Sequence, residues 1–89
     1  PDITREGATT WLVEGTANIR ELNRSQNWEL PTDGPKTING LVLELLETIP
    51  EAGTCLQVGG YPIEIIETDE NRIRTVRIGL QPDTSDIEQ

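Results

Sequence analysis

The chain has 89 residues, of which 34% are hydrophobic, and its formal net charge is −9. Its length predicts one domain over residues 1–89 with a thin core, because a short chain buries a smaller share of its surface than a long one. The acidic charge argues against nucleic acid as a partner, and no apolar run approaches the roughly 20 residues that span a bilayer, so we expect no direct membrane insertion.

The N-terminal part is expected to form two strands and a short helix. Residues 9–14 are β-branched and aromatic and predict a strand, with a shorter one over Ile3–Arg5. Asn18 can cap a helix, and Glu21 follows it at the spacing of a capping box. The polar residues 23–27 should end this helix.

A second helix is expected after a loop rich in Pro and Gly at residues 31–36. Thr37 can cap it and Pro50 should stop it, while Asn39 should point away from the core. Gly40 costs about 1 kcal/mol relative to Ala inside a helix, which indicates close packing of that turn against the sheet or the first helix. Five apolar side chains recur at helical spacing and should face the core: Ile38, Leu41, Val42, Leu45 and Ile49.

Three further strands should follow, joined by two hairpins. The pair Gly59-Gly60 is a two-residue hairpin signal and would place Val58 opposite Tyr61. The polar residues 68–71 predict a second, four-residue turn.

This second turn would set Ile63 against Val76 and Ile66 against Ile73. Together the two hairpins would place six apolar side chains on one buried face: Leu56, Val58, Tyr61, Ile63, Val76 and Ile78. Ile66 and Ile73 would lie on the opposite face.

The order of strands and helices predicts an α+β fold, an antiparallel sheet with two helices packed on one face. Pro82 should end the last strand. The core would then span about residues 7–81, and the acidic residues 82–89 would form a frayed tail.

Histidine and a second cysteine are missing from the chain. The chain has no His, and Cys55 is its one cysteine, so an internal disulfide, a thiolate or imidazole zinc site and a Ser-His-Asp triad using Ser25 or Ser85 are excluded. We expect Cys55 to be a buried structural thiol, because no adjacent base or basic cluster would activate it. No catalytic residue is predicted.

Carboxylates are abundant but show no pattern of a site. Glu67, Asp69 and Glu70 share a turn, yet neither this turn nor the acidic tail has the ligand spacing of a calcium loop. The acidic tail residues are Asp83, Asp86 and Glu88. We therefore interpret both groups as solvated and predict no metal site. Glu64 should point outward, opposite Thr75.

The sequence also gives little indication of a site for phosphates or other anions. The sequence contains neither Gly-x-Gly-x-x-Gly nor Gly-x-x-x-x-Gly-Lys, the two glycine-rich motifs that bind phosphates, and Gly59-Gly60 is explained by a turn. Cofactor-binding residues are therefore unknown, and no cofactor is expected. Three arginines, at positions 72, 74 and 77, line the last strand. They could receive an anion or an acidic partner, although pairing with Glu64 and Glu67 is the simpler interpretation.

An ordered set of landmarks runs from about Gly7 to Leu80. These are Gly7, residues 11–15 (Trp-Leu-Val-Glu-Gly), 19–23 (Ile-Arg-Glu-Leu-Asn), 30–31 (Leu-Pro), 37–44 (Thr-Ile-Asn-Gly-Leu-Val-Leu-Glu), 49–53 (Ile-Pro-Glu-Ala-Gly), 60–63 (Gly-Tyr-Pro-Ile), 72–73 (Arg-Ile) and 76–78 (Val-Arg-Ile). In this order they resemble the CorC/HlyC transporter-associated domain.

The resemblance implies a C-terminal, non-catalytic domain that modulates ion transport in magnesium/cobalt efflux or hemolysin-like membrane proteins. It implies contacts with the CBS domains and the membrane region of the same parent chain, on the cytoplasmic side of the membrane. It also implies a fold like part of the FAD-binding fold of the p-cresol methylhydroxylase (PCMH) type. A small-ligand module for an adenine or flavin nucleotide is therefore the alternative, with FAD supported by fold analogy only, and a homodimer stays open.

Overall fold

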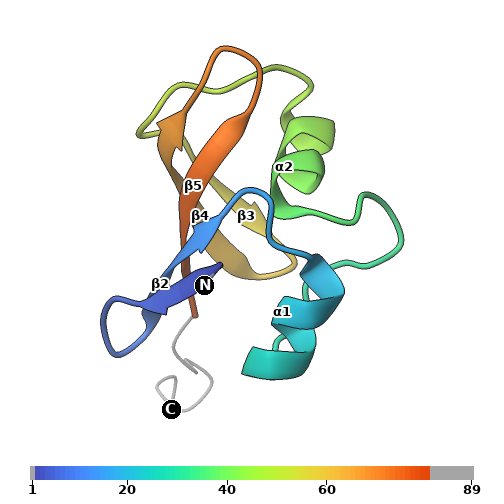
Figure 1. Ribbon diagram of the computed structural model, residues 1–89, viewed down its shortest axis with the longest axis vertical. Helices are drawn as coiled ribbons and strands as arrows, with labels where there is room; N and C mark the ends of the chain where they lie inside the picture. The colour runs from blue at the N-terminus through green and yellow to red at the C-terminus, as the bar shows by residue number, and fades with distance from the viewer. Residues whose placement is uncertain (1, 81–89) are drawn as a thin grey trace, which may run out of the picture.

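The structure, a computed structural model, describes residues 2–80 and consists of a five-stranded sheet with both helices on one of its faces (Figure 1). In chain order the elements are β1 (Ile3–Arg5), β2 (Thr10–Glu14), α1 (Ile19–Gln26), α2 (Ile38–Leu46), β3 (Cys55–Val58), β4 (Tyr61–Thr68) and β5 (Ile73–Gly79). Every strand pair is antiparallel, in the order β1-β2-β5-β4-β3. The predicted α+β class is confirmed, while Pro82 and the predicted tail lie outside the described residues.

The first hairpin has the predicted register. Val58 pairs with Tyr61 and, two residues on, Leu56 pairs with Ile63. Gly59 and Gly60 have φ values of 58° and 87°, and a two-residue turn of this kind needs positive φ at both central positions.

The second hairpin does not have the predicted register. Ile63 pairs with Ile78 rather than with Val76, and Val76 pairs with Ile65. The shift is two residues because β4 runs on through Thr68 before the chain turns. Since side chains alternate with a period of two, an even shift leaves the same set of side chains on the buried face.

Two irregularities next to the turn explain a further difference. The register slips between Ile65 and Glu67 and again between Glu67 and Thr68, so that Ile73 pairs with Thr68. Ile73 is thereby turned into the core, where it is 1% exposed, although the regular pattern predicted it on the opposite face.

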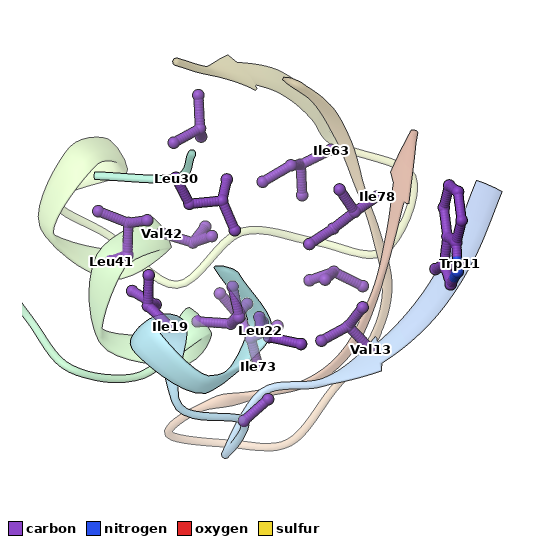
Figure 2. Close-up of a cluster of buried hydrophobic side chains, with 14 of the residues drawn as sticks. Trp11, Val13, Ile19, Leu22, Leu30, Leu41, Val42, Ile63, Ile73 and Ile78 are labelled. Carbon is purple, nitrogen blue, oxygen red and sulfur yellow. The ribbon is translucent and has the colours of Figure 1, made fainter. Parts of the chain in front are cut away.

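The core lies between the sheet and the helices (Figure 2). Trp28, in the segment after α1, packs edge-on against Trp11 of β2 with ring centroids 5.4 Å apart, and lies 5.9 Å from Tyr61. The Tyr61 hydroxyl accepts a hydrogen bond of 2.8 Å from the Glu29 backbone N–H. This aromatic cluster fixes the connection between the helices over the end of the sheet.

The first helix begins as predicted but ends later. The Asn18 side chain accepts a hydrogen bond of 3.0 Å from the Glu21 N–H. The helix continues to Gln26, and Asn27 ends it in the left-handed conformation with φ 62°. Asn23 lies inside the helix and does not end it. Its side-chain amide donates to the Leu30 carbonyl (3.0 Å) and accepts from the Leu30 N–H (2.9 Å).

The second helix is capped as predicted but ends before Pro50. Thr37 Oγ1 accepts from the Gly40 N–H at 3.2 Å, and Glu47, with φ 61°, ends the helix after Leu46. Leu45 and Ile49 are 51% and 39% exposed, so the prediction that they face the core is wrong.

Gly40 is closely packed, but not against the elements we expected. A Cβ atom at this position would lie 2.9 Å from Pro35 Cβ and 3.3 Å from Thr37 Oγ1. The helix therefore packs here against the loop that precedes it, rather than against the sheet or α1.

Gly15 lies where β2, β5 and α2 meet. Its N–H donates to the Arg74 carbonyl and its carbonyl accepts from the Asn39 N–H, both at 2.8 Å. The Asn39 side chain in turn accepts from the Ile73 N–H at 2.8 Å, so Asn39 does not point away as predicted. A Cβ atom on Gly15 would collide with the Ile73 carbonyl oxygen.

Gly15→Ala should destabilise the fold by roughly 1–3 kcal/mol, because the added methyl group would force backbone apart at this junction. Gly34→Ala is the matched control, since its Cβ would meet only the flexible end of Glu44, with Oε1 at 3.1 Å. Thermal unfolding followed by circular dichroism measures both. Equal midpoints for the two variants would contradict the role of Gly15.

Candidate functional site

Both helices cover one face of the sheet, and among residues 2–80 no helix covers the opposite, open face (Figure 1). One row of residues crosses that face from edge to edge, because each residue is the register partner of the next. In order the row is Thr4, Leu12, Arg77, Glu64 and Cys55. Arg77, on the central strand β5, stands in the middle of this row.

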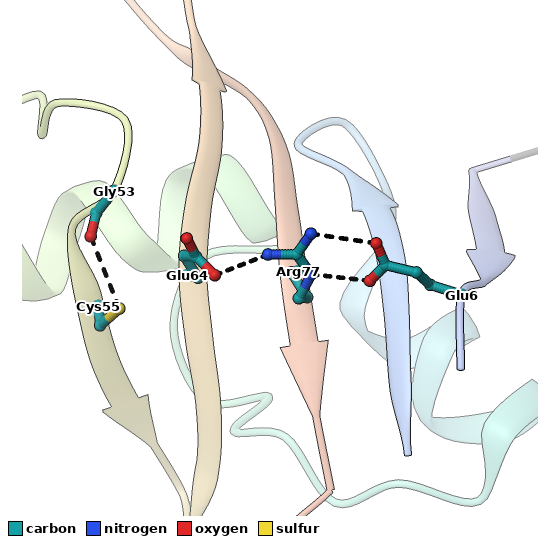
Figure 3. A network of polar contacts seen from close by, with 5 residues as sticks. All are labelled: Glu6, Gly53, Cys55, Glu64 and Arg77. Atoms are coloured by element: carbon teal, nitrogen blue, oxygen red, sulfur yellow. Dashed lines mark hydrogen bonds and ion pairs between the residues drawn. The ribbon is translucent and has the colours of Figure 1, made fainter. Parts of the chain in front are cut away.

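Arg77 is held by two carboxylates (Figure 3). Its Nε and Nη2 atoms donate to the two oxygens of Glu6 at 2.7 and 3.0 Å, and its Nη1 donates to Glu64 Oε1 at 2.7 Å. Two parallel N–H···O bonds of this kind are among the stronger charge-assisted contacts in proteins. The guanidinium group of Arg77 is therefore already bound by two carboxylates of the protein itself.

These contacts shift both ionisation equilibria. The hydrogen bond from Arg77 holds the pKa of Glu6 below its ordinary value of 4.5. The hydrogen bonds to Glu6 and then to Glu64 hold the pKa of Arg77 above its ordinary value. Glu6 and Arg77 therefore both stay charged at neutral pH.

Only part of this network could be predicted from the sequence. The Arg77–Glu64 pair was expected, although Glu64 lies opposite Arg77 and not opposite Thr75. Glu6 was missed because it lies 71 residues from Arg77 in the chain, and no local pattern links the two.

The other two arginines pair differently from the prediction. Arg72 Nε and Arg74 Nη1 both approach Asp69 Oδ2 at 3.3 Å, and neither pairs with Glu64 or Glu67 among the described residues. Their side chains are about half exposed, and exposed pairs of this kind contribute little to stability.

A shallow hollow of about 330 Å³ lies beside Arg77 on the open face. Pro62 and Gly79 contribute to its lining, together with Cys55 and Gln57 from the edge strand β3. A Cβ atom on Gly79 would lie 3.3 Å from Pro62 Cγ, so a larger residue there would reduce the hollow.

Cys55 is exposed, so the expectation of a buried thiol is wrong. It pairs with Glu64 and belongs to the open face, while its neighbour Leu56 pairs with Ile63 on the core side. Its Sγ atom lies 3.6 Å from the Gly53 carbonyl oxygen.

The remaining candidates do not assemble into a site in residues 2–80. No three Asp, Glu or Cys side chains in this range lie close enough together to hold a metal ion. Ser25 Oγ donates to the carbonyl of Leu22 at 3.5 Å. Ser85, Asp83, Asp86 and Glu88 lie outside the described residues.

Neither helix in the described part of the chain is long and apolar enough to cross a bilayer. The described part of the chain is a small sheet with an open face and a central arginine, Arg77, that is held by two carboxylates.

Residues 4–82 match the CorC_HlyC family, described as a transporter associated domain. The chain belongs to this family.

Similar proteins are much longer than this domain. The "UPF0053 inner membrane protein YfjD" of Escherichia coli K12 is 42% identical over 77 residues, which cover 86% of this chain but 18% of that protein. The "Magnesium and cobalt efflux protein CorC" of Escherichia coli K12 is 27% identical over 75 residues, which cover 84% of this chain and 26% of that protein. The chain therefore spans about a fifth to a quarter of these curated relatives.

A solved structure confirms the fold of this CorC_HlyC domain. A conserved protein of unknown function from Haemophilus influenzae Rd KW20 superposes with a TM-score of 0.85 at 36% identity. The match covers 91% of this chain and 100% of that chain.

Glu6→Gln should lower the thermal midpoint at neutral pH, and the difference from the parent should shrink in acid. The reason is that the folded-state pKa of Glu6 lies below 4.5, so its contribution is complete above that pH and is lost as the pH falls through the folded value. Thermal melts at a series of pH values measure this difference. Glu70→Gln, an exposed carboxylate outside the network, is the control, and an acid-insensitive difference would contradict the prediction.

Cys55 should react with a thiol reagent in the folded protein at a rate within about tenfold of that in denaturant, because the side chain is exposed. Cys55→Ser should change stability by less than about 0.5 kcal/mol, as is usual at a surface site. A reaction that requires global unfolding would show that the thiol is buried after all.

Proposed function

We propose that this CorC_HlyC domain is a non-catalytic accessory domain that regulates ion transport by a larger membrane protein through contacts between domains. The observation that carries the proposal is the family match over residues 4–82, in a region that makes up only 18% of an inner membrane protein and 26% of a magnesium and cobalt efflux protein. A segment this short needs the rest of its parent protein for any transport activity.

In this proposal the partners are the CBS domains and the membrane region of the parent chain, and a second copy of the domain is a further partner. The domain would lie on the cytoplasmic side of the membrane. The acidic net charge of −9 supports a role away from anionic lipid surfaces.

A non-catalytic role is supported by how the polar side chains are used. The chain has no His, and the two shortest ion pairs of the described residues join Glu6 and Glu64 to Arg77. Arg77 holds the pKa of Glu6 below its ordinary value and so further from neutral pH, which makes Glu6 a poor general acid or base there.

The test compares four forms of a full-length protein that carries the domain: the parent, a deletion of the domain, Gly15→Val, which disrupts the fold without shortening the chain, and Gly34→Ala as the control. We expect both changes to alter the rate or the ion dependence of Mg²⁺ or Co²⁺ efflux from loaded vesicles, whereas Gly34→Ala should not. Unchanged transport after deletion would refute a regulatory role.

The second candidate is a small-ligand module for an adenine or flavin nucleotide, which the PCMH-like fold expectation favours. The hollow beside Arg77 is the feature that speaks for it, although about 330 Å³ is near the small end of ligand pockets. Arg77 contributes to the lining, but its donors are already directed at Glu6 and Glu64. A pyrophosphate would have to displace these carboxylates.

We therefore expect no tight flavin binding by the domain. Calorimetric titration with FAD should show no Kd below about 10 μM, which corresponds to roughly 7 kcal/mol. Gly79→Val is the control that reduces the hollow. Tight binding by the parent that Gly79→Val abolishes would establish the ligand-binding alternative instead.

A further inference from the structure

The apolar stripe of α2 is longer than the core that covers it. Ile38, Leu41 and Val42 are at most 4% exposed, but Leu45, the next residue of the stripe at helical spacing, is 51% exposed. Ile49, just beyond the helix, is 39% exposed. Among residues 2–80 these two are the large hydrophobic side chains that remain exposed, and both lie at the same end of α2.

Neither exposed side chain belongs to the packing of the fold. The core and the partly buried residues packed on it include Leu43 and Leu46 of α2 but not Leu45 or Ile49. Polar residues at these two positions would therefore leave the core intact. In contrast, α1 has a polar surface apart from its buried Ile19 and Leu22.

The surroundings of this pair are acidic. Glu44, Glu47 and Glu51 lie within two residues of Leu45 or Ile49 in the chain, all three are exposed, and none forms an ion pair among the described residues. Between residues 37 and 71 the chain has seven Asp or Glu and no Lys or Arg. A second copy docking through this surface would bring like charges together, which opposes association.

We propose that the end of α2, defined by Leu45 and Ile49 with the rim of Glu44, Glu47 and Glu51, binds an amphipathic helix with aliphatic anchors and flanking Lys or Arg. The anchors would extend the apolar stripe of α2, and the basic residues would pair with the rim. The inference deepens the proposed function, on which it rests for the expectation that the domain works through contacts with other segments.

The binding test uses a synthetic helical peptide of Leu and Lys in an amphipathic pattern, with a Leu and Glu peptide of the same pattern as control. We expect the Leu-Lys peptide, but not the Leu-Glu peptide, to bind the 89-residue chain and to shift NMR signals of residues 43–51. Binding that shifts other surfaces, or no binding of the Leu-Lys peptide, would overturn the proposal.

Variants separate this surface from general attraction to an acidic protein. Leu45→Ser with Ile49→Ser should weaken binding at least about tenfold, whereas Leu12→Ser on the open sheet face should leave it unchanged. Glu47→Gln with Glu51→Gln should weaken binding and reduce its salt dependence more than Glu67→Gln with Glu70→Gln, which removes the same charge elsewhere. Circular dichroism shows whether each variant folds, and Ile49→Ser alone replaces the double change if it does not.

Two further outcomes would also overturn the inference. Self-association of the chain that Leu45→Ser abolishes would identify a second copy as the occupant. In the full-length protein, a transport change on deletion of the domain but not with Leu45→Ser and Ile49→Ser would reject this surface while leaving the regulatory role in place. Unchanged transport in both would instead reject the regulatory role.

Discussion

The pairing of β2 with β5 joins the N-terminal strands to the β3–β5 part of the sheet, and much of the described structure depends on it. The register runs from Thr10 opposite Gly79 to Glu14 opposite Thr75, and the Gly15 N–H continues it with a bond to the Arg74 carbonyl. This one pairing brings Trp11 over the core and places the turn carrying Glu6 beside Arg77. Both the aromatic cluster and the charged row thus follow from it.

Features with a local cause could be predicted from the sequence, and those with a distant cause could not. The caps at Asn18 and Thr37 and the turn at Gly59-Gly60 depend on a few neighbouring residues, and all three are confirmed. The β4–β5 register depends on two irregularities beside a turn in which several polar residues are equivalent. The predicted register was wrong by two residues, an even number, so the six side chains predicted on the buried face do lie on the core side. Ile73, beside the irregularities, is the exception.

The open face shows the same division. Glu6 and Arg77 meet only because β1, β2 and β5 are neighbours, so no sequence pattern reveals their contact. Cys55 is different, because the prediction that Leu56 and Val58 face inward already placed it outward by alternation. We expected a buried thiol because free cysteines are usually buried, but the alternation of side chains along the strand decides which face Cys55 occupies. Asn23 and Asn39 likewise serve as backbone clamps, a role that needs the distant Leu30 and Ile73 in place.

The position where α2 ends decides which surface the domain presents. Leu45 already follows Leu41 along the stripe within α2, and Ile49 would have followed one turn later had the helix continued to Pro50. Glu47 instead adopts the left-handed conformation and stops the helix after Leu46, so the stripe runs out beyond the core. Burying an aliphatic side chain fully is worth about 1.5–3 kcal/mol, and at these two positions the fold leaves much of that free energy unused. Gly15, Asn23 and Asn39, which belong to the landmarks that resemble the family, are accounted for by contacts within the fold. The regulatory role proposed above would therefore depend on surface features such as the end of α2.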